Sequence, residues 1–392
     1  MSVRRDRSSA KKFMHTIGID LGTTNTVAAA NAGVLPLRSV EKPTPILPSV
    51  VAYLPNGETV VGEQARARRA IDVKNTVYSA KRVIGEAWHS YQAREFSAHY
   101  PFDLVASSEG QVGFKTRAGV VTATDVATEI LRSLCRQIEV DAGELAAVVT
   151  VPVGFSAQQR GATLSALHAA GFASARCIAE PVATALAYLD RNNLRYGAVY
   201  DLGGGTFDLA IIECIREPLR IVAHGADPYL GGDDIDRALA NWIADLVLRE
   251  RGWDLRSDPQ VFTRLTLEAE RAKVRLSGTP TAPVDLSAVD AAAPPDMPAI
   301  TLQRSTLWQL SVALIKRTFV VCDQVLSSAG LTARQIDAVF LAGGATLLPG
   351  VRDAVAEYFG PRLRYELDPM HVVSLGASIA AARPRFAGLL SQ

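Results

Sequence analysis

Several residue types are scarce in this chain of 392 residues. Its four cysteines are far apart and lack the close spacing of metal ligands, a pattern typical of reduced thiols in a cytoplasmic protein. The six histidines are equally dispersed, which argues against a structural zinc site. The composition therefore points away from disulfide-bonded secreted proteins and from zinc proteins.

Neither sign of charge dominates, because 41 basic and 40 acidic residues leave a formal net charge of +1. This balance gives no electrostatic reason to expect binding to nucleic acid or to a membrane surface. No segment approaches the roughly 20 apolar residues that a membrane-spanning helix requires. Residues 1–15 are basic but no apolar stretch follows them, so we predict a disordered tail.

Two common nucleotide-binding patterns are also missing. The sequence contains neither G-x-x-x-x-G-K-[ST] nor G-x-G-x-x-G. These absences exclude the P-loop and the Rossmann dinucleotide fingerprint as the basis of a nucleotide site. Any phosphate-binding element in this chain must therefore have a different form.

Such an element is predicted by the segment VYDLGGGTFD, residues 199–208. Apolar residues lead to Asp201, three glycines and Thr206 follow, and an alternating pattern resumes at Phe207, which indicates a β-hairpin with a glycine-rich tip. Glycines leave backbone N–H groups unshielded and permit positive φ, so the tip can wrap around a phosphate. Asp201, just before the tip, can hold a hydrated cation.

A second segment, IGIDLGTTNTVAAA at residues 17–30, repeats this organisation. Here Asp20 precedes Gly22, Thr23 and Thr24, and the two aspartates lie 181 positions apart (201 − 20), close to half of the chain. One such turn is more often an ordinary hairpin, but two in register, each followed by threonine, favour phosphate binding. The repeat predicts two lobes that face each other across a nucleotide.

Strand and helix patterns alternate around both hairpins, which indicates an α/β fold with a mixed sheet in each lobe. A length of 392 residues also favours about two large domains. We assign 16–195 to lobe I, 196–383 to lobe II with an inserted helical and β subdomain at about 233–320, and 384–392 to a C-terminal tail. Helices are expected over 63–70, from Thr124, from Ser156, from Glu180, from Asp233 or Asp234, and over 259–276, 306–329, 349–359 and 372–382.

Eight segments now form a familiar series between residues 17 and 383: GIDLGTTNT, AKR, VTVPVGFSAQQR, AEPVATALAY, DLGGGTFD, YLGGDDID, ERAKVRLS and LAGGATLLPGV. In this order they resemble the nucleotide-binding domain of the seventy-kilodalton heat-shock chaperones, the DnaK-type members of the actin-like ATPase superfamily. AKR and ERAK favour this family over sugar kinases and bacterial actin filaments. The resemblance implies a two-lobed actin-like fold with duplicated ribonuclease-H-like lobes, inserted subdomains and a central nucleotide cleft.

The resemblance also implies a chemistry, the hydrolysis of ATP to ADP and phosphate with Mg²⁺, and it allows K⁺ as a further cation. Asp20 and Asp201 would hold the Mg²⁺ through water, and Lys81 would position the attacking water with help from Glu180 and Asp208. Phosphoryl transfer requires mainly positioning and charge neutralisation, which these residue types supply.

The nucleotide itself would be held by glycines and hydroxyl groups at the phosphates and by a helical face at the adenosine. Glu270, Lys273 and Ser277 are spaced so that all three can lie on that face. The complete set implied by the resemblance is Gly22, Thr23, Thr24, Asn25, Gly203, Gly204, Gly205, Thr206, Gly231, Gly232, Glu270, Lys273, Ser277, Gly343, Gly344, Ala345 and Leu347.

The chain departs from the family pattern on the adenine side. Leu347 stands where the family carries an arginine that stacks on adenine, and Met370 and His371 do not fit the family's N-P-D-E segment. After Ala382 the family continues with a linker and a peptide-clamping β-sandwich, whereas this sequence offers RPRFAGLLSQ. Either the sequence is part of a longer chain, or the protein is an ATPase lobe alone.

Three functions remain open at this point. The leading one is a chaperone-type ATPase that lacks a peptide-binding domain. The alternatives are a nucleotide-sensing regulatory module with little turnover and a filament-forming actin relative. The partners implied by the leading function are nucleotide, a J-domain co-chaperone, a nucleotide-exchange factor or a separate substrate-binding protein, and neither nucleic acid nor a membrane.

Overall fold

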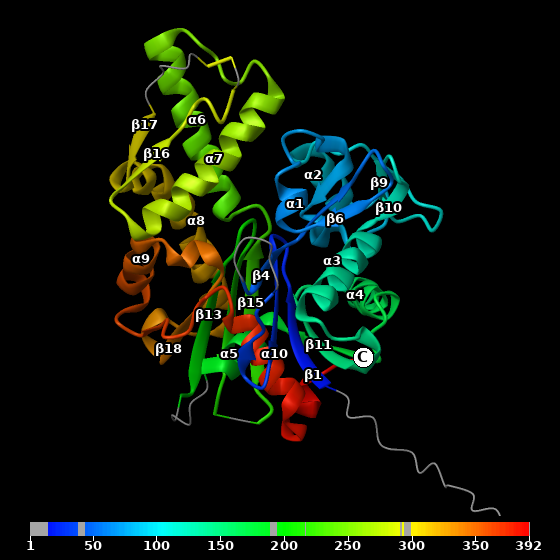
Figure 1. The fold of residues 1–392 in the computed structure, drawn as a ribbon. Coiled ribbons are helices and arrows are strands. Elements are labelled where there is room, and N and C mark those ends of the chain that lie inside the picture. Colours follow the sequence, from blue (N-terminus) through cyan, green and yellow to red (C-terminus); the bar gives the residue numbers. More distant parts are fainter. Residues whose placement is uncertain are drawn as a thin grey trace, which may run out of the picture.

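The structure is a computed structural model that describes residues 15–37, 44–188, 194–215, 217–290, 292–293 and 299–391. The tail predicted over 1–15 lies outside these residues except for His15, which begins the first strand. Two lobes stand side by side, and both have a sheet in their lower part and a smaller subdomain above it (Figure 1). Among the described helices, none has the length and apolarity to span a bilayer.

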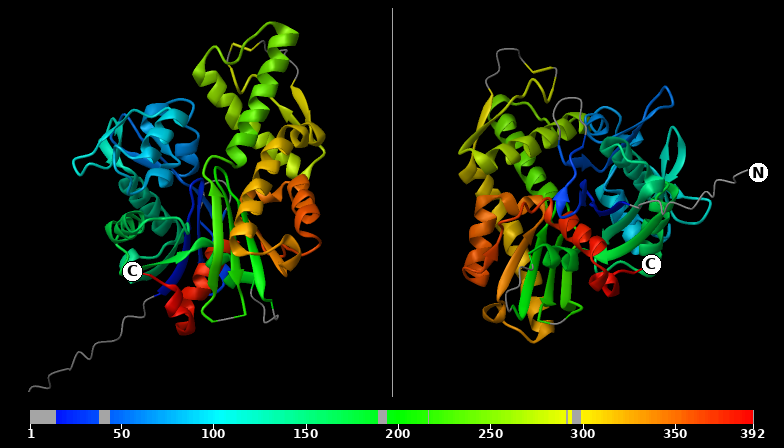
Figure 2. Two further views of the ribbon diagram at one scale, coloured as in Figure 1. Left: turned by 180° about the vertical axis from the view of Figure 1, so that it is seen from behind. Right: turned by 60° about the horizontal axis from the view of Figure 1, so that its bottom comes forward.

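The lobe I sheet has the strand order β12-β11-β1-β2-β3, with β4 paired to β2. β1 pairs antiparallel with β2 and parallel with β11, and β11 pairs parallel with β12. The helices α3 and α4 pack together beside this sheet (Figure 1), and two further views show the same side of lobe I in the same colours (Figure 2). The elements are β1 (His15–Leu21), β2 (Asn25–Ala30), β3 (Gly33–Val34), β4 (Ile46–Pro48), β11 (Leu145–Val151), β12 (Ser174–Ala179), α3 (Ala123–Ile138) and α4 (Ala157–Ala169).

The lobe II sheet repeats this topology in the order β19-β18-β13-β14-β15. Its hairpin strands β13 and β14 are antiparallel, and β18 lies parallel to β13 as β11 lies parallel to β1. The predicted duplication is therefore present in the folded chain. The elements are β13 (Tyr196–Leu202), β14 (Phe207–Glu213), β15 (Arg220–Asp227), β18 (Ala338–Ala342) and β19 (Leu363–Arg364).

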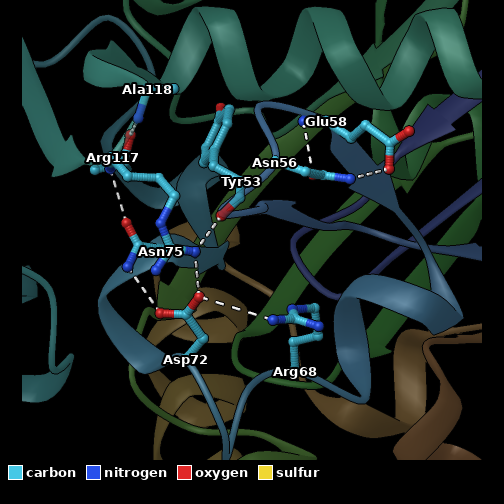
Figure 3. Close-up of polar contacts among 9 residues, drawn as sticks. Tyr53, Asn56, Glu58, Arg68, Asp72, Asn75, Arg117 and Ala118 are labelled. Carbon is cyan, nitrogen blue, oxygen red and sulfur yellow. Dashed lines mark hydrogen bonds and ion pairs between the residues drawn. The ribbon is translucent and has the colours of Figure 1, made fainter.

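The upper part of lobe I consists of two small three-stranded sheets and short helices. A polar network fastens this part together (Figure 3): Arg117 donates to the Tyr53 carbonyl over 2.7 Å and pairs with Asp72, which also accepts from Asn75. The elements are β5 (Val50–Tyr53), β6 (Thr59–Val61), β7 (Thr76–Tyr78), β8 (Leu104–Ala106), β9 (Val112–Thr116), β10 (Gly119–Thr122), α1 (Glu63–Arg66), η1 (Val73–Asn75), η2 (Ala80–Val83) and α2 (Tyr91–His99).

The upper part of lobe II is built from the long helices α6 and α7, which pack against each other and share one apolar core with α8. A two-stranded sheet, β16-β17, closes its outer side. The elements of this upper part are α6 (Gly232–Arg251), α7 (Pro259–Gly278), β16 (Thr281–Val284) and β17 (Ile300–Gln303). The elements that pack beside the lobe II sheet are α8 (Arg304–Ala329), η4 (Ala333–Gln335), η5 (Gly344–Leu347) and α9 (Pro349–Phe359).

Two helices cross between the lobes, α5 (Glu180–Tyr188) and α10 (Val372–Ala382). They share a buried apolar cluster that includes Val148 of lobe I and Phe340 of lobe II. Small residues let them approach closely, since a Cβ built at Gly376 would lie 1.7 Å from the Ala183 carbonyl oxygen. This glycine therefore allows α5 and α10 to pack closely where the two lobes join.

Most helix predictions agree with the structure, and those over 349–359 and 372–382 match it residue for residue. Four others were wrong at one end. α7 ends at Gly278 rather than at residue 276, and α8 begins at Arg304 rather than at residue 306. α1 ends at Arg66 rather than at residue 70, because the backbone continues in tighter turns such as Arg68 N–H to Ala65 O. The residue that caps α3 is Thr122 rather than Thr124, since Thr122 and Asp125 form a capping box.

The segment predicted as a C-terminal tail packs against lobe I. A short helix, η6 (Pro384–Leu389), buries Phe386 in the cluster shared by α5 and α10. Ser391 then exchanges two backbone hydrogen bonds with Cys177 on β12, of 2.8 and 2.9 Å. The last described residues therefore extend the edge of the lobe I sheet.

Substitution of Gly376 by alanine should destabilise the fold by about 2 kcal/mol or more, because the new methyl group overlaps backbone atoms of α5 and forces the two helices apart. The measurement is the free energy of unfolding in urea. The matched control is Gly161→Ala in α4, where a Cβ meets no atom within 4 Å and the better helix propensity should stabilise by about 0.5–1 kcal/mol. Equal effects at both positions would contradict this packing account.

Candidate functional site

A cavity of about 510 Å³ lies between the lobes and is lined by both predicted hairpin tips. Each tip has four residues, closed by the pair Leu21 and Thr26 in lobe I and by Leu202 and Phe207 in lobe II. The predicted residues that line this cavity are Asp20, Gly22, Thr23, Thr24, Asn25, Lys81, Glu180, Asp201, Gly203, Gly204, Gly205, Thr206, Asp208, Gly343 and Gly344.

The two tips abut one another, and glycine is required where they touch. A Cβ at Gly204 would lie 2.2 Å from the Thr24 hydroxyl oxygen, so lobe II approaches lobe I with bare backbone. Two further glycines contact the lobe II tip on the side away from the cavity. A Cβ at Gly231 would lie 2.6 Å from the Gly204 carbonyl oxygen, and the N–H of Gly232 donates to the Gly203 carbonyl over 3.0 Å. Gly231 and Gly232 thus shape the tip without lining the cavity.

Lys81 is the cation at the centre of this site. It lies on η2, and its Nζ donates to Glu180 Oε1 over 2.7 Å, with the two side chains 10% and 16% exposed. Glu180 is the first residue of α5, directly after strand β12. The pair therefore joins the upper subdomain of lobe I to the sheet below it.

Three aspartates surround this ion pair. Asp20 and Asp201 occupy equivalent positions, two residues before the first glycine of each tip, and Asp208 is the strand partner of Asp201. Asp20 Oδ1 accepts a hydrogen bond of 3.2 Å from Thr150 on β11. Both halves of the repeat thus place aspartates beside the same ion pair in the cleft.

Burial and mutual repulsion raise the pKa values of these aspartates. Burial, then the Glu180 charge, raises the pKa of Asp208 to about 7, although Lys81 opposes the shift. Burial also raises the pKa of Asp20 to about 6, against the lowering effect of Lys81. Burial and the neighbouring carboxylates hold the pKa of Asp201 well above its usual range.

The opposite effect acts on Lys81. Burial by itself lowers the pKa of the Lys81 ammonium group, but the charges of Glu180 and Asp20 outweigh it and raise the pKa above its ordinary value. The carboxylates around Lys81 carry more negative charge than this lysine offsets, an arrangement that a bound cation would stabilise. Among the described residues, no group of three or more acids, histidines or cysteines encloses a metal directly.

Only some of the residues expected at the adenosine line this cavity. Gly343 has φ of 82° and packs so closely that a Cβ would lie 2.2 Å from the Leu202 carbonyl oxygen. Next to it, Gly344 faces Met370, and both line the cavity. Ala345 and Leu347 belong to η5 and do not line it.

Glu270, Lys273 and Ser277 also lie outside the cavity wall. Glu270 pairs with Arg66 across the lobes over 2.7 Å, and the Arg66 and Lys273 charges lower its pKa against the effect of burial. Lys273 bonds to Asp236 over 2.7 Å, while Ser277 donates to the backbone of its own helix. Their role at the adenosine stays a prediction.

Sequence reasoning missed several residues that line the cavity, among them Arg82, Tyr91, Phe155, Tyr229 and Met370. The sequence could have indicated Arg82 as a site residue, because it follows Lys81 in the AKR segment. Met370 departs from the family pattern, yet it forms the wall beside Gly344. Tyr91 and Tyr229 carried no local signal, since their place depends on how the lobes meet.

Two related sheets, each with a glycine-rich hairpin tip, and a lysine among acids between them define a two-lobed nucleotide-binding protein of the actin-like ATPase class. Comparison with known proteins agrees with this class. The sequence model of the family described as "Hsp70 protein" matches residues 16–383, and the chain belongs to this family.

Two relatives illustrate the similarity. The chain is 38% identical over 373 residues to "Chaperone protein DnaK" from each of two strains of Thermus thermophilus. The match covers 93% of this chain and 60% of the length of each relative. Membership confirms the predicted fold class and agrees with the prediction of a chaperone-family nucleotide-binding domain, and it does not favour the regulatory and filament-forming alternatives.

The raised pKa of Asp208 predicts how stability depends on pH in the metal-free chain. The pKa is about 7 in the folded chain and about 3.8 when unperturbed, so the folded state binds this proton more tightly. The stability that this group contributes is complete below about pH 4 and is lost as the pH rises through 7. Unfolding in urea with EDTA should show a loss of about 1–3 kcal/mol between pH 5 and pH 8.

The matched control is Asp208→Asn, which keeps the shape of the side chain and removes its titration. Its stability should vary less over the same pH interval than that of the unmodified chain. If the free energy of unfolding changes equally with pH in both proteins, the carboxyl group of Asp208 does not titrate with a raised pKa.

Proposed function

We propose that this chain binds ATP with Mg²⁺ between its lobes and hydrolyses it to ADP and phosphate as the ATPase part of a chaperone. The observation that carries the proposal is the buried Lys81–Glu180 pair, which lies among three aspartates at the point where both hairpin tips meet. Family membership supports the same interpretation. The bounds 16–195 and 196–383 are our working definition of the two lobes.

The phosphates would be held by backbone N–H groups of the two tips and by the hydroxyl groups of Thr23, Thr24 and Thr206. Mg²⁺ binds oxygen ligands and keeps several of its waters, so Asp20 and Asp201 would hold it through those waters. The excess of buried carboxylates fits such a cation. Bound Mg²⁺ would supply charge neutralisation at the phosphates.

Hydrolysis requires a water aligned with the terminal phosphate and a group that takes its proton. Lys81 would stabilise the negative charge on the phosphate, while Glu180 fixes the ammonium group in place. Asp208 lies in the same cavity with a pKa of about 7, which suits a group that accepts a proton near neutral pH. No covalent intermediate with the protein is needed.

The finer assignments belong to the same proposal. They are K⁺ as an additional cation, a cytoplasmic location, and a J-domain protein, a nucleotide-exchange factor or a separate substrate-binding protein as partners. Their support is the similarity to the DnaK relatives. Adenosine recognition would combine the apolar wall at Gly343, Gly344 and Met370 with Glu270, Lys273 and Ser277, which a change in the lobe arrangement could expose.

Lys81→Ala should reduce the rate of ATP hydrolysis by about 10²–10³ and leave the affinity for ADP nearly unchanged. The physical reason is that the lysine acts on charge that develops during the reaction more than on the bound ground state. The measurements are single-turnover hydrolysis of radiolabelled ATP and calorimetric titration of ADP.

The matched control is Lys74→Ala, since Lys74 is 58% exposed and pairs with Asp103 on the surface. This variant should hydrolyse ATP at the rate of the unmodified chain. Hydrolysis by the Lys81 variant at the normal rate would overturn the assignment of Lys81, and absence of ATP binding to the unmodified chain would overturn the proposed function.

A further inference from the structure

The two lobes also touch along the side of the cavity formed by α2. The imidazole ring of His99, at the end of α2 in lobe I, stacks on the phenol ring of Tyr229 in lobe II. Their centroids are 4.3 Å apart and the planes are inclined by 18°. Tyr229 lines the same cavity as both hairpin tips, so this contact joins two walls of that cavity.

Arg82 reinforces the same contact from inside the cavity. Its guanidinium lies 5.2 Å from the Tyr229 ring centroid, donates to the Gly205 carbonyl over 2.7 Å and also donates to the Pro228 carbonyl. All three partners belong to lobe II, whereas Arg82 follows Lys81 in lobe I. We call His99, Tyr229 and Arg82 the front clamp.

The front clamp is not part of either apolar core. His99 is exposed and Tyr229 is half-buried, and neither residue belongs to the two large core clusters of the described residues. Each lobe buries its own cluster without them. The contact therefore contributes little to the folding of either lobe, and its main physical effect is on how readily the lobes separate.

Separation of the lobes on this side would break the contacts of His99, Tyr229 and Arg82 together. A nucleotide held between the hairpin tips would lie between walls from both lobes, and the front clamp bridges two of those walls. The hydrogen bonds of the clamp run to the backbone of Gly205 and Pro228 rather than to the Lys81–Glu180 pair. Opening of the clamp can therefore proceed without rearrangement of that ion pair.

We infer that the front clamp sets the rate at which ADP leaves the cleft without setting the rate of hydrolysis. The inference rests on the proposed function, because it requires a nucleotide in the cavity. A stacked aromatic pair and a cation over a ring are both lost on opening, so removal of either ring lowers the barrier to opening. His99 acts through Tyr229 and is a positioning residue, not a catalytic one.

The test is a double-mutant cycle on the dissociation rate of Mg²⁺ and a fluorescent ADP, displaced by unlabelled ADP in a stopped-flow instrument. His99→Leu and Tyr229→Leu should each release the ADP about three- to tenfold faster, which corresponds to the loss of one aromatic contact. The double variant should release it no faster than Tyr229→Leu alone, because both changes break the same contact. Tyr229→Phe, which keeps the ring, should behave as the unmodified chain.

Two controls remove rings that do not bridge the lobes. His89 contacts Trp88 within lobe I, and Tyr365 lies under Arg352 within lobe II and is 51% exposed. His89→Leu and Tyr365→Leu should leave ADP release unchanged. Single-turnover hydrolysis should remain within about twofold of normal in His99→Leu, since this side chain does not line the cavity.

The outcomes separate the inference from the function on which it rests. Normal ADP binding with unchanged release in His99→Leu, or strictly additive effects of the two substitutions, would overturn the inference alone. Additive effects would mean that Tyr229 acts by touching the nucleotide and His99 by some other route. Absence of ADP binding to the unmodified chain would overturn both the inference and the proposed function.

Discussion

The arrangement of the site depends on one buried ion pair, Lys81 with Glu180, placed among Asp20, Asp201 and Asp208. The lysine is held charged by these acids, while the acids repel one another and are pushed toward their protonated forms. Such a cluster is stable only with further positive charge or with bound protons. The fold thus maintains a site whose excess negative charge favours a bound cation or bound protons.

The rest of the architecture brings this cluster together from both halves of the chain. The lobe I sheet supplies Asp20 and one tip, and the lobe II sheet supplies Asp201, Asp208 and the other tip. Gly376 lets α10 pack closely against α5 between these sheets. Contacts above the cleft, from Arg66 to Glu270 and through the front clamp, hold the lobes around the cavity.

The sequence predicted those parts of the site whose signals are local. The two aspartate-glycine tips, their repeat and the helices after Ser156 and Glu180 follow from short-range turn and capping chemistry, and the structure contains them. Glu270 and Lys273 do share a helix, but their partners Arg66 and Asp236 come from other elements. The stack of His99 on Tyr229 and the position of Met370 depend on how distant segments pack, which no local pattern encodes.

The most direct test of the central claim is calorimetric titration of the chain with Mg²⁺ and ADP at pH 6.5, in two buffers with different enthalpies of ionisation. Because the pKa of Asp208 is about 7 and that of Asp20 about 6, part of the cluster is protonated before the ligand binds. A cation at the site favours the ionised carboxylates, so binding should release protons and should weaken strongly when EDTA removes the Mg²⁺. Binding that releases no protons and is equally tight in EDTA would contradict the account.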